Sequence, residues 1–146
     1  MESLRHVGKG VLVKLSGWEN RLIRYLRTIA TASFRPGELD CALFFANCVR
    51  EITGDDIAAK YRGKYRSLEK GYAALRKDGF DSHVDYVASL FERIPVSMAQ
   101  RGDGVVLLDA DGNEALGIVQ GENVYILGMN GLGLCKLEKA VKAFRI

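Results

Sequence analysis

The chain has 146 residues, of which 48% are apolar and 27% are charged, with three cysteines and two histidines. This size and apolar content suffice to bury one hydrophobic core, and they exclude a disordered chain. The formal net charge of +3 is mild, and the basic segments 60–66 and 136–142 have acidic residues nearby. We therefore expect an ordinary charged surface and no nucleic-acid interface.

The cysteines and the apolar stretches exclude other classes of protein. Cys41, Cys48 and Cys135 form no CxxC pair and no cluster with histidine, so the sequence predicts no disulfide, no metal site and no cofactor. No apolar stretch approaches the length needed to cross a bilayer, and we expect no membrane insertion. Free cysteines fit synthesis in a reducing cytoplasm.

Helical patterns occupy the front of the chain. After a weakly patterned leader, residues 1–16, we expect a single domain over 17–146 that begins with an amphipathic helix at 18–30. Asp40 is a good N-cap for a second helix that runs to about Thr53 and ends at Gly54. A third helix is expected over 67–78 with Ser67 as its cap, and a fourth opens after Ser82 and ends near residue 92.

Strand patterns occupy the back of the chain. Short apolar runs at 104–108, 114–120 and 123–128 are separated by turn-forming residues, and a weaker run follows at 132–137. A short helix or strand then leads to residue 146. Helices first and an antiparallel meander last predict an α+β fold, with the N-terminal helices packed on the C-terminal sheet.

Cys41 is the leading candidate for chemistry because it starts the second helix. The amides and the dipole of a helix N-terminus can lower a thiol pKa, which suits a nucleophile. Cys41 also shares a helix face with Phe45 and Ile52, and a packed core cysteine is the alternative that the local sequence favours. Cys48 and Cys135 are expected to be structural.

The supply of histidine limits any catalytic interpretation. Cys–His catalysis needs an imidazole within hydrogen-bond reach of the sulfur, and only His6 and His83 exist. His6 lies in the leader. His83 lies at a predicted helix start, where we expect a solvated histidine in preference to a catalytic base.

Several motifs in order resemble the NlpC-like cysteine peptidases of the papain fold. The resemblance rests on Phe-x-x-Gly-x-x-Asp-Cys at 34–41, Arg-Gly-Asp at 101–103 and Leu-Gly-Ile at 116–118. The segments Asp-Cys-Ala-Leu-Phe at 40–44, Thr-Gly-Asp at 53–55, Tyr-Arg-Gly-x-Tyr at 61–65 and Phe-Arg at 144–145 look more closely like a phage-borne branch of that superfamily. Residues 18–146 are covered. The branch has no established function, and its members are typically small proteins from tail gene clusters.

The resemblance places the nucleophile on Cys41 and the histidine position on Ala115. Because alanine cannot accept a proton, the sequence favours a pseudoenzyme: a papain-like structural or assembly component of a phage tail, located in the virion. Its partners would be other tail proteins, with possible peptidoglycan contact. Segments 61–65 and 144–145 are candidate contact points. The alternative is an active peptidase or amidase that cleaves peptidoglycan peptides, with Cys41 as nucleophile and His83 as an unusual base.

Overall fold

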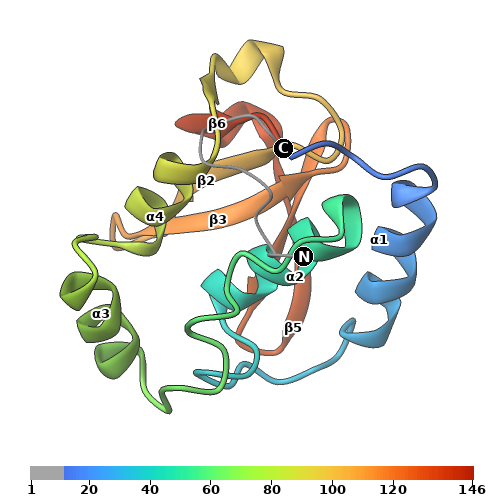
Figure 1. Cartoon of the computed structure of the whole chain (residues 1–146). Coiled ribbons are helices and arrows are strands. Elements are labelled where there is room, and N and C mark those ends of the chain that lie inside the picture. Colours follow the sequence, from blue (N-terminus) through green and yellow to red (C-terminus); the bar gives the residue numbers. More distant parts are fainter. Residues whose placement is uncertain (1–11) are drawn as a thin grey trace.

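The computed structural model describes residues 12–146 and has the α+β architecture expected from the sequence. The helices α1–α4 lie in the first part of the chain and six strands, β1–β6, in the second (Figure 1). The α-helices are α1 (Trp18–Thr28), α2 (Cys41–Thr53), α3 (Leu68–Lys77) and α4 (His83–Leu90). The strands are β1 (Arg93–Ile94), β2 (Gly104–Leu108), β3 (Glu114–Val119), β4 (Asn123–Gly128), β5 (Gly131–Lys136) and β6 (Lys142–Phe144), with short 3₁₀ turns η1 (Val96–Met98) and η2 (Leu137–Lys139).

The strands form one antiparallel sheet in the order β1-β6-β2-β3-β4-β5. Strands β2 to β5 make the expected meander, whereas β6 returns to lie between β1 and β2. Gly104 of β2 faces Phe144 of β6 on one side and Ile118 of β3 on the other. The end of the chain thus forms an interior strand of the sheet, next to the edge strand β1.

Side-chain caps fix where three of the helices begin. The side-chain oxygens of Asp40, Ser67 and Ser82 each accept a backbone N–H from the third residue beyond, as the sequence predicted. Such a bond satisfies one of the four free donors at a helix start and typically contributes about 1 kcal/mol. The caps therefore set the positions of Cys41 and His83, which directly follow two of them.

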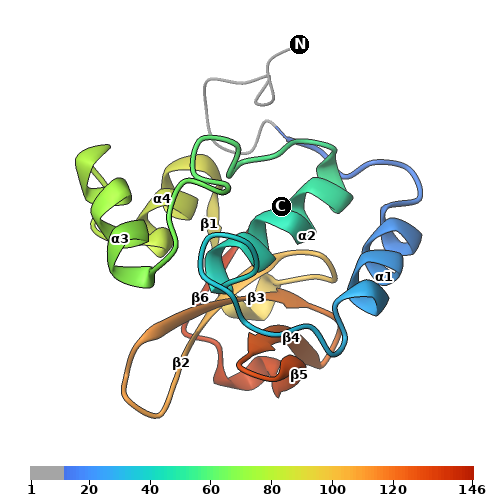
Figure 2. The same cartoon turned by 90° about the horizontal axis from the view of Figure 1, so that it is seen from below.

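Helix α2 lies at the centre of the molecule, between α1 and the sheet, with α3 and α4 on another side (Figure 2). Its buried residues Phe44, Phe45, Cys48, Val49 and Ile52 have exposed fractions of 0%. The expectation that Cys48 is a core residue is confirmed. Phe45 reaches the sheet at Gly104, where a Cβ atom would stand only 2.6 Å from the ring, so a side chain at 104 would push α2 away.

The last residues of the leader pack on the domain. Leu12 is buried, and the amide of Leu15 donates to the carbonyl of Ile52 at 2.8 Å. Lys14 Nζ donates to the carbonyl of Ile146 at 2.7 Å and lies 3.2 Å from Asp103 Oδ1. His6 and residues 1–11 in general lie outside the described part. Among residues 12–146, no helix is long and apolar enough to cross a membrane.

Two aromatic residues of the suggested contact segments are not surface residues. Tyr61 is buried, and its hydroxyl donates to Asp78 Oδ2 at 2.6 Å. Phe144 is 1% exposed because it lies in β6, inside the sheet. The prediction that both side chains are available to a partner is wrong.

Candidate active site

Asp40 holds the first turn of α2 in place through both carboxylate oxygens. Oδ1 accepts the N–H of Leu43 at 2.9 Å, and Oδ2 accepts the N–H of Gly37 at 3.0 Å and the hydroxyl of Tyr65 at 2.5 Å. Gly37 has φ +84°, and a Cβ there would stand 1.8 Å from the carbonyl oxygen of Tyr65. Two neighbouring amides and a tyrosine from another chain segment thus hold Asp40, and they fix the backbone of Cys41.

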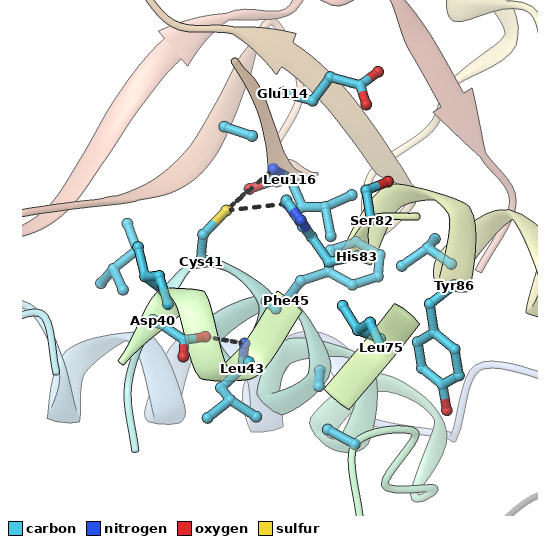
Figure 3. Close-up of a pocket in the computed structure, with 18 of the residues that line it drawn as sticks. Asp40, Cys41, Leu43, Phe45, Leu75, Ser82, His83, Tyr86, Glu114 and Leu116 are labelled. Carbon is cyan, nitrogen blue, oxygen red and sulfur yellow. Dashed lines mark hydrogen bonds between the residues drawn. The ribbon is translucent and has the colours of Figure 1, made fainter. Parts of the chain in front are cut away.

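The sulfur of Cys41 lies among three potential partners (Figure 3). His83 Nε2 is 4.0 Å away, and the carbonyl oxygen of Leu116 in β3 is 3.9 Å away. The N–H of Leu116 donates to the sulfur at 3.3 Å. The thiol proton therefore has two acceptors at similar distance, one of which is an imidazole.

His83 is the first residue of α4, and it is 8% exposed. The expectation of a solvated histidine is wrong, because the ring is buried and points toward Cys41 (Figure 3). Burial lowers the pKa of His83 below its usual 6.5, against weaker opposing effects of the Glu114 and Asp40 carboxylates. His83 is therefore neutral at pH 7 and able to accept a proton.

Burial also keeps the thiol of Cys41 protonated. Desolvation raises its pKa from 9.0 to about 11, the N–H of Leu116 opposes the shift, and the charge of Asp40 adds to it. The resting pair is consequently a neutral thiol beside a neutral imidazole. Such a pair can act by general-base catalysis, in which the base takes the proton as the nucleophile attacks.

The pair lies in the wall of a cavity of about 720 Å³. The cavity is bounded by α2, α3, α4, the segment 57–65 and strands β3 and β4. Its lining includes Phe34, Leu43, Phe45, Tyr61, Tyr65, Leu68, Tyr72, Leu75, Tyr86, Val87, Asp109, Glu114, Ala115, Ile126 and Leu127. A volume of this size is typical of sites for small ligands.

Ala115, which the sequence resemblance aligns with a histidine, lies in β3 and lines the same cavity. Its neighbour Leu116 contacts the cysteine sulfur, so position 115 lies next to the nucleophile position. Within residues 12–146 the imidazole nearest to Cys41 comes from α4 instead of β3.

Sequence reasoning missed two tyrosines of this site. Tyr65 was expected at a contact surface, but its hydroxyl holds Asp40 from 25 residues away in the chain. Tyr72 of α3 places its ring 6.0 Å from that of His83, centroid to centroid, at an angle of 46°. The Tyr-Arg-Gly-x-Tyr motif contains Tyr65 but does not indicate that its hydroxyl bonds to Asp40. No local feature of the sequence indicates the position of Tyr72.

The architecture is the papain-like fold of the NlpC type. The structure is similar to the NlpC/p60 domain of the peptidoglycan hydrolase SagA, with a TM-score of 0.52 and 16% identity, over 90% of this chain and 100% of that chain. At this identity the likeness shows the fold. The chain belongs to the family described as a domain of unknown function, DUF6950, which matches residues 13–146. No curated protein matches the chain.

Proposed function

We propose that this protein is a cysteine hydrolase that works by acyl transfer, with Cys41 as the nucleophile and His83 as the base. The observation that carries the proposal is the 4.0 Å separation of Cys41 Sγ from His83 Nε2 in the wall of a cavity of about 720 Å³. Catalytic hydrogen bonds are often long in ligand-free structures and shorten when substrate binds.

The proposed reaction uses the neutral state of both groups. His83 takes the thiol proton as the sulfur of Cys41 attacks the carbonyl carbon of an ester or amide. The proton then passes to the leaving alcohol or amine, and a thioester with Cys41 remains. Water, activated by the same imidazole, hydrolyses the thioester and restores the thiol.

The test compares hydrolysis by the wild-type protein with hydrolysis by Cys41→Ala. p-Nitrophenyl butanoate and a purified cell-wall peptide are the probes, because the fold likeness is to a domain of a peptidoglycan hydrolase. Cys135→Ala is the matched control, since Cys135 lies on β5 and is not among the cavity residues. We expect turnover in the wild type and in the control and none above background in Cys41→Ala. Equal rates in all three proteins would contradict the proposal.

A second candidate function is a non-catalytic assembly component of a phage tail, found in the virion and bound to other tail proteins. Ala115 at the position aligned with the histidine and the high thiol pKa of Cys41 support this candidate, together with the sequence resemblance to a phage-borne branch. The test is size-exclusion chromatography of the purified protein with proteins from the neighbouring tail genes. Co-elution with one of them is expected, and a monomer with no affinity for any of them would contradict this candidate.

A further inference from the structure

We propose that the acyl group transferred to Cys41 is apolar and uncharged, and that the cavity beside the Cys41–His83 pair is the site that holds it. This inference rests on the proposed function, because it names the substrate class of the same site. A medium-length aliphatic acyl group and a bulky apolar aminoacyl group share this chemistry.

The charges around the cavity favour an uncharged group. Among the described lining residues there is no lysine or arginine, and the charged ones are Asp40, Asp109 and Glu114. Asp40 is occupied by the helix cap, Asp109 accepts the amides of its own turn, and Glu114 pairs with Lys142 Nζ at 3.0 Å. A carboxylate on the acyl chain would therefore be repelled by these acidic side chains. No cation of the lining would compensate for the loss of its hydration.

Three of the four tyrosines that line the cavity have hydroxyls already bonded to other groups of the protein. Tyr61, Tyr65 and Tyr86 line the cavity, but their hydroxyls donate to Asp78, Asp40 and the carbonyl of Ile57 respectively. Their aromatic rings are left as the lining surface. The neighbouring residues Phe34, Leu43, Leu75, Val87, Ile126 and Leu127 are apolar as well.

The proposed step is balanced with water as the co-reactant. The bond from Cys41 Sγ to the acyl carbon forms as the bond from that carbon to the ester oxygen breaks, and the thiol proton travels through His83 to the leaving alkoxide. Water then releases the acyl group as a carboxylic acid and returns the proton to sulfur. The carboxylic acid then loses its proton to solvent, and the acidic lining disfavours the negative charge of the carboxylate, which promotes its release.

The first experiment measures kcat/KM for p-nitrophenyl butanoate, hexanoate and octanoate, and for the p-nitrophenyl ester of N-acetylphenylalanine. Each buried methylene is expected to raise kcat/KM about fourfold, so octanoate, with four more methylenes, exceeds butanoate by roughly 250-fold. The phenylalanine ester distinguishes an aminoacyl group from an aliphatic acyl group. A kcat/KM above that of the octanoate ester assigns the site to an aminoacyl group, and a kcat/KM below it assigns the site to an aliphatic chain. A kcat/KM that does not rise with chain length, with the phenylalanine ester no faster than butanoate, would overturn the inference.

The second experiment reverses the charge preference at the rim. Leu68 lines the cavity and is 43% exposed, so Leu68→Lys introduces a cation without opening the core. Two substrates are compared, the octanoyl ester and its analogue with a carboxylate at the ω end of the chain. We expect Leu68→Lys to increase kcat/KM for the carboxylate analogue, relative to kcat/KM for the octanoyl ester, at least fivefold. Leu134→Lys, at a 60% exposed position on β5, is the matched control and should leave the ratio unchanged. An equal change in both variants, or none in either, would contradict the assignment.

A binding measurement separates failure of the site from failure of the chemistry. Octanamide and butanamide are uncharged probes, and calorimetry on the Cys41→Ala protein should show that octanamide binds roughly 250-fold more tightly. If this difference is found but Cys41-dependent hydrolysis is absent, the proposed function is wrong and the apolar site stands. If hydrolysis is found and the two amides bind equally, the inference is wrong and the proposed function stands.

Discussion

The first turn of α2 and its middle contain one cysteine each, and the two cysteines have different surroundings. Cys48 is 0% exposed and packs among core residues, and burial raises its pKa well above the usual value. Cys41 lies two turns earlier, where the sulfur meets the N–H of Leu116, the imidazole of His83 and a cavity. Burial raises both pKa values, so burial alone does not distinguish them. The difference lies in whether a proton acceptor and room for a substrate are present.

The largest expected effect concerns the proton acceptor at the first turn. His83→Gln should lower kcat/KM for ester hydrolysis by about 100- to 10,000-fold, because general-base catalysis is lost while the side-chain volume is largely retained. Steady-state kinetics with p-nitrophenyl butanoate measures the change. Tyr125→Phe is a control in β4, where Tyr125 is not among the cavity residues. Loss of less than a factor of three in His83→Gln would show that His83 is not the base.

The next effect concerns the resting state of the thiol. A pKa of about 11, against the usual 9.0, leaves about 100-fold less thiolate at pH 7.5. Iodoacetamide should therefore alkylate Cys41 roughly 100-fold more slowly than a cysteine in an unstructured peptide, and Cys48 more slowly still because it is buried. Mass spectrometry of timed digests follows both residues. Alkylation of Cys41 at the peptide's rate would contradict the neutral pair.

Tyr65→Phe tests the support of the first turn. The hydroxyl donates to a carboxylate that is 1% exposed, and a hydrogen bond to a charged group contributes about 1.5–3 kcal/mol. We expect the free energy of unfolding to fall by about 2 kcal/mol in urea denaturation, together with lower ester hydrolysis. Tyr125→Phe is again the control. Equal free energies of unfolding for the two variants would show that the Tyr65 hydroxyl does not stabilise Asp40.

The smallest effect concerns the middle of α2. Cys48→Ala removes a buried sulfur and should cost about 1 kcal/mol in the free energy of unfolding, with ester hydrolysis unchanged. Cys41→Ala should have the opposite profile, with hydrolysis lost and stability nearly unchanged because the site borders a cavity. If both variants lost activity equally, the two turns of α2 would not differ in function.

The parts of the fold that depend on neighbouring residues were predictable from the sequence. The helix starts at Asp40, Ser67 and Ser82 follow from cap residues, and the strands β2 to β5 follow from apolar runs between turns. Strand β1 was not expected, and the end of the chain was left open between helix and strand. These strands are only two and three residues long, and they owe their pairing to each other and to β2.

The candidate site was only half predictable for the same reason. Cys41 was identified from its place at a helix start, which is local. The contact with His83 joins residues 42 apart in the chain, and it depends on how α4 packs against α2 and β3. A helix start with a free positive dipole suggests a solvated histidine, but burial among apolar neighbours outweighs that local effect.

The central claim is that His83 is the base for Cys41, and the pH dependence of acylation tests it most directly. The rate of p-nitrophenol release in a single turnover is measured from pH 4 to 9 for the wild-type protein and for His83→Gln. Because the pKa of His83 lies below 6.5, the wild-type rate should rise with pH, with its midpoint below 6.5, and then stay level to pH 9. The variant should lose this plateau and instead rise about tenfold per pH unit as thiolate forms. Superimposable profiles of the two proteins would contradict the account.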